Sequence, residues 1–173
     1  METFECIRQR RDIRAFKDIP IPPATIEKIL AAAIQAPSAD NTQEWEFVVV
    51  ESTKTKDMLA DAAFGQDFIT KAPVVIVVCS DTEKIRKAYG ERGVNLYTIQ
   101  GTAAATQNLL LAAWDMDIGG CWVGAFNESK VAEALFLPQR VRPLAMVPLG
   151  IPASMPSKPG RKPLGASLHK ERY

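Results

Sequence analysis

Apolar residues follow two different periodicities along the chain. Between Ile26 and Ile34 they recur every three or four positions, which predicts an amphipathic helix that Pro37 terminates. The run Val74–Cys79 is instead apolar at every position and rich in β-branched side chains. An unbroken run of this kind predicts a strand in the middle of a sheet, covered on both faces.

The same pattern predicts further elements on both sides of this strand. We expect helices at 2–11, 54–63, 82–88 and 94–116 and one ending at 135, strands at 47–50 and 144–150, and an extended segment at 121–126. Helices and strands do not alternate as regular βαβ units, and no repeat or linker interrupts the chain, so we predict one α+β domain spanning 1–173. Beyond 150, Pro152, Pro156, Pro159 and Pro163 predict an extended tail that packs on another surface.

The charge balance and the N-terminus restrict the partners and the location. Lys and Arg total 21 against 20 Asp and Glu in 173 residues, a formal net charge of +1. A general nucleic-acid binder carries a clear basic excess, so no nucleic-acid partner is expected. The N-terminus is too charged for a secretion signal, and no apolar run approaches the roughly 20 residues of a membrane span. We therefore expect a cytoplasmic protein that does not associate with membranes.

Cysteine and histidine usage restricts the chemistry. Cys6, Cys79 and Cys121 are widely spaced and odd in number, which argues against a disulfide framework or a zinc site and favours a reducing compartment. His169 is the only histidine and lies in the tail, so histidine metal sites and Ser-His or Cys-His nucleophile pairs are disfavoured. We expect no metal, and a catalyst that takes its reactivity from a cofactor.

Two basic clusters are candidates for binding an anion. The N-terminal cluster contains Arg8, Arg10, Arg11, Arg14 and Lys17, and the tail cluster contains Lys158, Arg161 and Lys162. Guanidinium forks match phosphate oxygens in bidentate geometry, and a bound phosphate relieves the repulsion within a cluster. The alternatives are a solvated basic face for the first cluster and a flexible solubilising end for the second.

Two other segments carry small or amide residues suited to a flat ligand. The loop 36–45 offers donors and acceptors close to the backbone, although it also reads as a simple helix-to-strand connection anchored by Trp45. The segment 119–124 is bracketed by glycines, which permit close approach of a planar ligand to the backbone but also permit tight turns. It is not a GxGxxG fingerprint that opens a helix, so no Rossmann site is predicted.

Taken in order, these four segments resemble the nitroreductase family of FMN enzymes. They are RRxxRxF at 10–16, APSxxNxQxW at 36–45, GGCWVGAF at 119–126 and KPxRKPL at 158–164, and the resemblance covers nearly the whole chain. It implies an α+β fold in which helices flank a central, mostly antiparallel sheet. It also implies an intertwined homodimer with exchanged terminal segments and an FMN site at each interface. Because the flavin carries the chemistry in this family, no side chain is expected to act as a covalent catalyst.

The resemblance assigns residues to each part of the cofactor. Those matching the groups that hold the phosphate and approach the pyrimidine edge are Arg10, Arg11, Arg14, Lys158 and Arg161. Those matching the strand that faces the ring near N5 are Cys121, Trp122, Val123 and Gly124, with Gln66 as a further polar contact. Those matching the loop contributed by the partner subunit are Pro37, Ser38, Ala39 and Asn41. The family usually has Ser in place of Asp12, which we expect to face the ribityl chain or to pair with an arginine, and Pro in place of Glu44.

The activity implied is transfer of hydride from NADH or NADPH, through flavin N5, to a nitroaromatic, a quinone or a flavin. No separate dinucleotide motif distinguishes the two donors. The chain lacks the larger helical insertion that covers the site in many members, so an open pocket is expected. The alternatives are a same-fold flavoenzyme with a dehalogenating or flavin-fragmenting reaction, a non-enzymatic FMN-binding protein, and an interaction module for an acidic partner.

Overall fold

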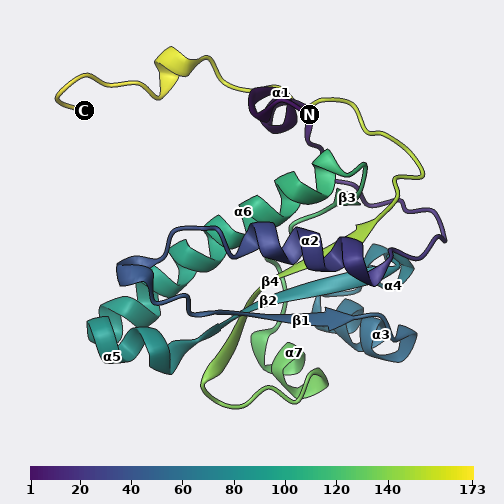
Figure 1. Cartoon of the computed structure of the whole chain (residues 1–173), viewed down its shortest axis with the longest axis horizontal. Helices are drawn as coiled ribbons and strands as arrows, with labels where there is room; N and C mark the ends of the chain where they lie inside the picture. Colours follow the sequence, from purple (N-terminus) through teal and green to yellow (C-terminus); the bar gives the residue numbers. More distant parts are fainter.

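The computed structural model describes residues 1–173 and contains one four-stranded sheet with helices on both faces (Figure 1). The strands are β1 (Trp45–Val50), β2 (Val74–Asp81), β3 (Gly119–Gly120) and β4 (Val141–Gly150). The helices are α1 (Thr3–Gln9), α2 (Pro23–Ala33), α3 (Thr53–Ala62), α4 (Phe68–Lys71), α5 (Thr82–Arg92), α6 (Thr98–Asp115) and α7 (Glu128–Ala134). A π-helical turn, Gly93–Tyr97, joins α5 to α6.

The sheet has the order β1-β2-β4-β3, and all neighbouring strands run antiparallel. Every residue of β2 is buried, which confirms the central strand predicted from its unbroken apolar run. Successive β2 side chains point to opposite faces of the sheet. Val74, Ile76 and Val78 therefore pack with α2 and α6, whereas Val75 and Val77 pack with α3 and α7. The predicted α+β class, with one antiparallel sheet between helical layers, is confirmed.

Several element boundaries differ from those predicted, each for a local reason. The last strand begins at Val141, three residues before the predicted 144, and includes Pro143. Proline has no N–H for a ladder, and the strand accommodates it at a bulge where the β2–β4 register shifts between Val78 and Cys79. The long helix predicted from 94 begins as the π-helical turn. The predicted extended segment 121–126 forms no continuous strand: it meets β4 through the Val123–Met146 bridge and a hydrogen bond from the Cys121 N–H to the Pro148 carbonyl at 3.4 Å.

The N-terminal arginine segment is held at the β3 edge of the sheet. The Ile13 N–H donates to the Gly120 carbonyl at 3.0 Å, and the Lys17 N–H donates to the Ile151 carbonyl at 2.8 Å. Ile13 is fully buried and lies where a Cβ on Gly119 would come within 2.4 Å of its Cγ1. Because Gly119 has no side chain, the N-terminal segment can lie directly against the sheet at this point. This places the arginines beside the residues where the C-terminal tail begins.

The tail leaves the body of the molecule after Pro152. Every residue from 153 to 173 is exposed, and Figure 1 shows the tail extending past α1 and away from the sheet. It includes large apolar side chains, since Leu164 is 76% and Leu168 54% exposed. A helix both long and apolar enough to cross a membrane is not found in the structure.

Candidate functional site

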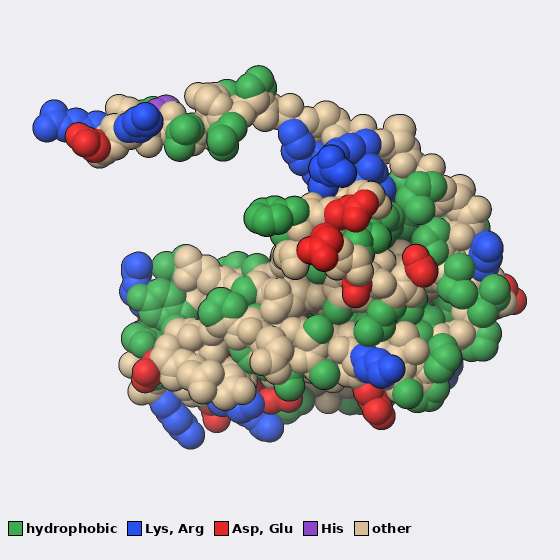
Figure 2. Space-filling view, turned by 45° about the horizontal axis from the view of Figure 1, so that its top comes forward, with side chains coloured by type: hydrophobic (Ala, Val, Ile, Leu, Met, Phe, Trp, Pro, Cys, Tyr) green, Lys and Arg blue, Asp and Glu red, His purple; other side chains and the backbone are tan.

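Five cationic side chains from the two ends of the chain line one cavity. It has a volume of about 240 Å³ and is lined by Arg8, Arg10, Arg11, Lys158 and Arg161, together with Ile7 and Pro159. Figure 2 shows the basic side chains gathered where the tail passes over the body. No carboxylate lines this cavity, which we call the cationic pocket. Two basic clusters that lie about 150 positions apart in the sequence thus line a single cavity.

Two of the pocket arginines are fixed by contacts within the N-terminal segment. Arg10 forms an ion pair with Asp12, at 2.9 Å between Nη1 and Oδ1, so Asp12 takes the second of its two expected roles. Arg11 donates through Nη1 to the carbonyls of Arg8 (3.2 Å) and Arg10 (2.9 Å) and also to that of Gln9. These carbonyls lie at the C-terminal end of α1, where unpaired acceptors and the helix dipole attract a cation. Both guanidinium groups therefore have restricted positions before any ligand binds.

Arg8 also lines the cationic pocket, although the family resemblance did not assign it a role. It lies on α1, two positions after the buried Cys6, and residues two apart do not share a face of a helix. The spacing from Cys6 could have indicated a role for Arg8, because a ligand can bind only on the face of α1 that points away from the buried Cys6.

Arg14 lies outside the cationic pocket and beside the segment 121–124. Its guanidinium carbon stands 5.7 Å from the centre of the Phe68 ring, a cation–π contact. Its positive charge also acts on the Cys121 thiol. Phe68 begins α4, a four-residue helix that the sequence pattern did not reveal, since one helical turn is too short to show a period.

The segment 121–124 presents alternate residues to the sheet and to solvent. Val123 exchanges hydrogen bonds with Met146 at 2.9 and 3.0 Å, and both Cys121 and Val123 are buried. Trp122 and Gly124 are exposed, and their N–H groups have no protein acceptor. The segment therefore carries two backbone donors without a protein acceptor, next to a residue that is hydrogen-bonded to β4.

Gln66 ties the loop before α4 to this segment. Its Nε2 donates to the carbonyls of Ala63 at 3.0 Å and Ala125 at 3.2 Å. The structure thus brings Gln66 close to the residues 121–124, although the two lie more than fifty positions apart in the sequence.

The loop that carries Pro37, Ser38, Ala39 and Asn41 lies elsewhere in the single chain. Its neighbours Ala36 and Trp45 pack on Ala105, in the first half of α6, and Figure 1 shows α1 at the opposite end of that helix. The Cys6 Sγ of α1 contacts the Leu111 carbonyl, in the second half. These four predicted residues are therefore not brought together with the arginines within one chain.

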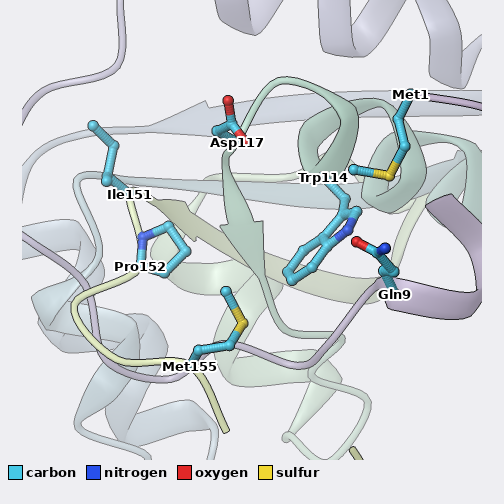
Figure 3. A pocket seen from close by; sticks show the side chains of 7 residues that line it. All are labelled: Met1, Gln9, Trp114, Asp117, Ile151, Pro152 and Met155. Atoms are coloured by element: carbon cyan, nitrogen blue, oxygen red, sulfur yellow. The ribbon is translucent and has the colours of Figure 1, made fainter. Parts of the chain in front are cut away.

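A second cavity, of about 410 Å³, does not fit a phosphate. It lies between α1, the end of α6 and the start of the tail (Figure 3). Its lining consists of Met1, Gln9, Trp114, Asp117, Ile151, Pro152 and Met155, with no Lys or Arg side chain. The cationic pocket is therefore the candidate anion site.

Comparison with known proteins identifies the family. The sequence model described as the nitroreductase family matches residues 7–66 and 62–151. The chain belongs to the nitroreductase family. It is 32% identical over 183 residues to an NADH dehydrogenase of Thermus thermophilus, covering 90% of this chain and 89% of the relative. It is also 27% identical over 184 residues to an FMN reductase (NADPH) of Bacillus subtilis, covering 99% and 74% of the two chains.

Solved structures of the nitroreductase family have the same fold. The NADPH:FMN oxidoreductase of Vibrio harveyi, solved in complex with NAD⁺, superposes with a TM-score of 0.91 at 28% identity, over 99% of this chain and 77% of that one. Nitroreductase A of Vibrio parahaemolyticus gives 0.91 at 29% identity, over 100% and 77%. The family predicted from the four motifs is confirmed.

Burial raises the pKa of two cysteine thiols in this nitroreductase-family chain. It raises the pKa of Cys79 to about 12, helped by the nearby Glu46 carboxylate. Burial also raises the pKa of Cys121, and the positive charge of Arg14 opposes this only in part. Cys121 therefore stays a neutral thiol near pH 7, which favours a packing role over that of a nucleophile.

The Cys79 thiol is expected to make stability fall at high pH. Its ordinary pKa is 9.0 and its folded value is about 12, so only the unfolded chain ionises between these values. The contribution of this thiol to the free energy of unfolding is complete below pH 9 and is lost as the pH rises toward 12. Between pH 8 and pH 10 the free energy of unfolding should fall by about 1.4 kcal/mol more in the native protein than in Cys79→Ala. Urea unfolding of both proteins at each pH measures this difference, and parallel curves would rule the prediction out.

Proposed function

We propose that the protein is an FMN-dependent oxidoreductase that passes electrons from NADH or NADPH to a small organic acceptor such as a nitroaromatic, a quinone or a free flavin. The observation that carries this proposal is the cationic pocket, formed by both ends of a chain with the nitroreductase-family fold. The names of the relatives, an FMN reductase and an NADPH:FMN oxidoreductase, support the same cofactor and donors.

The donor set of the cationic pocket fits the phosphate of FMN. All five of its cationic groups are arginine or lysine side chains, and Arg11 also donates to carbonyls at the end of α1. Arginine binds phosphate through two parallel charge-assisted hydrogen bonds, and Lys158 adds a compact positive charge. Asp12 lowers the net charge through its pair with Arg10 and holds that guanidinium in place. In this proposal Arg10, Arg11, Lys158 and Arg161 hold the phosphate.

The segment 121–124 and its neighbours fit the isoalloxazine ring. When bound, FMN supplies two-electron redox chemistry that the side chains of this protein lack. The free N–H groups of Trp122 and Gly124 can donate to polar atoms of the ring edge, and Gln66 holds the adjoining loop. Arg14, which lies beside this segment, would stabilise negative charge on the ring. These groups bind and orient, and none acts as a nucleophile.

The proposal includes a homodimer in which each FMN site takes residues from both subunits. Pro37, Ser38, Ala39 and Asn41 would then complete the site of the partner. Exposed apolar side chains support a second copy, because Phe4 on α1 is 88% exposed and the tail presents Leu164 and Leu168 without cover. The chain forms a single domain within this dimer. Three free, buried cysteines suit a reducing compartment, and we place the protein in the cytoplasm.

An anaerobic absorbance titration of the FMN-loaded protein with NADH, and separately with NADPH, tests the proposal. We expect either donor to bleach the flavin band within the mixing time, and a quinone to restore it. Free FMN at the same concentration is the control, since it reacts slowly without the protein. Stable FMN binding without bleaching would favour a non-enzymatic FMN-binding protein or a same-fold enzyme with another reaction. Failure to bind FMN would overturn the site as well.

A further inference from the structure

Glu44 is a buried acidic residue with no role in the function proposed above. It directly precedes β1, and its side chain is fully buried. The carboxylate oxygen Oε2 accepts a hydrogen bond from Thr42 Oγ1 at 2.7 Å. The other oxygen, Oε1, is the one buried side-chain polar atom in the structure that lacks a partner. A carboxylate in such a position is unfavourable for folding, so its presence calls for another explanation.

Helix α6 is shaped to receive this carboxylate. A Cβ on Gly101 would lie 2.4 Å from Oε1 of Glu44, so any side chain there would displace the carboxylate. Gly101 lies within α6, where glycine is a poor helix former. Glu44 and Gly101 are each unfavourable for folding, one as a buried carboxylate and the other as a glycine within a helix, and the two meet at one point. The absence of a side chain at Gly101 therefore leaves the space that the Glu44 carboxylate occupies.

The loop before Glu44 has a strained backbone that needs such an anchor. Asp40, Asn41 and Gln43 have φ angles of 50°, 54° and 47°, in the left-handed region that Asp and Asn tolerate but Gln rarely adopts. Strained conformations persist only where surrounding contacts fix them. Here the Gln43 N–H donates to Ser38 Oγ at 3.0 Å, and the Thr42 hydroxyl is held by Glu44. The Glu44 carbonyl, which accepts from the Asp81 N–H at 2.7 Å, fixes the end of the loop to β2.

We propose that Glu44 is a positioning residue for FMN: its buried carboxylate, seated against Gly101, holds Thr42 and thereby fixes the loop Pro37–Gln43 in the conformation that meets the cofactor of the partner subunit. This rests on the proposed function, which assigns Ser38 and Asn41 of that loop to the FMN site. Glu44 itself does not touch the cofactor. It fixes the loop before binding, and FMN binding therefore does not bear the entropy cost of ordering the loop.

The test compares variants that keep or remove the Thr42 contact. Glu44→Met fills the same space without an acceptor, and Thr42→Val removes the donor. Each should raise the dissociation constant for FMN about tenfold, as expected for one charge-assisted hydrogen bond. Glu44→Gln keeps an acceptor for Thr42 and should bind FMN within about threefold of the native protein. The double variant Glu44→Met/Thr42→Val should lose no more than either single one, because both remove the same contact.

Thr82→Val is the matched control, since it removes a threonine hydrogen bond, to the Arg140 carbonyl at 2.8 Å, outside the loop. FMN affinity is measured by flavin fluorescence, and the urea midpoint of the FMN-free protein is measured in parallel. The positioning role predicts weaker binding at an unchanged or higher urea midpoint. Native affinity in Glu44→Met and Thr42→Val, or losses that follow the urea midpoint, would overturn the role while leaving the proposed function intact. A native protein that does not bind FMN would overturn both.

Discussion

A chain ending at Ser157 is expected to be monomeric and to bind FMN at least about a hundredfold more weakly than the full-length protein. It loses Lys158 and Arg161 from the cationic pocket, and each hydrogen bond to a charged group contributes roughly 1.5–3 kcal/mol. It also loses the exposed Leu164 and Leu168, which we expect to pack on the partner. Light scattering after size-exclusion chromatography measures the mass, and a flavin fluorescence titration measures the affinity.

Two full-length variants separate the charges of the tail from its packing. Lys158→Ala/Arg161→Ala should remain dimeric but bind FMN weakly, whereas Leu164→Asn/Leu168→Asn should weaken the dimer. Because residues 153–173 are all exposed, the truncated chain should keep the native circular dichroism spectrum. A truncated dimer with native FMN affinity would refute both roles of the tail.

Arg10→Ala is expected to weaken FMN binding about a hundredfold, more than removal of any other single cation of the pocket. The variant loses a charge-assisted contact to phosphate and also leaves Asp12 without its partner. An unpaired carboxylate beside the pocket repels the phosphate dianion. We therefore expect Arg10→Ala/Asp12→Asn to recover about tenfold of the lost affinity. The comparison is made by FMN titration at two salt concentrations, since screening weakens both the attraction and the repulsion.

Arg86→Ala is the control for this series. Arg86 is an exposed arginine of α5 that pairs with Glu91 and does not line the cationic pocket. Its replacement should leave FMN affinity unchanged at either salt concentration. If Arg10→Ala also bound FMN like the native protein, the phosphate would have to lie elsewhere.

Much of the fold could be predicted because its strongest signals are local. The alternation of the two faces of β2 follows from strand geometry, so the run from Val74 already required cover on both sides. The helical period from Ile26 and the stop at Pro37 likewise follow from neighbouring residues. Elements without a readable period were missed or misjudged, such as the single turn α4 and the strand that accommodates Pro143 at a bulge.

The candidate site could be predicted only in part, because its chemistry depends on non-local contacts. The motifs predicted Arg10, Arg11, Lys158 and Arg161 as phosphate-binding residues and an arginine as one of two expected partners of Asp12, but not which arginine pairs with Asp12 or that Arg8 lines the same cavity. The burial of Glu44 against Gly101 had no signal beyond a glutamate where the family usually has proline.

The family, the central strand and the types of residue available to bind an anion could all be predicted from the amino-acid sequence. Each of these depends on the identity and spacing of residues close together in the chain. Which groups from distant parts of the chain lie together became clear from the folded structure. The N-terminal segment reaches the tail because Ile13 bonds to Gly120 and Lys17 bonds to Ile151, over separations of more than a hundred residues. Such pairings follow from the closure of the whole sheet and its helical layers, and no local pattern of side chains encodes them.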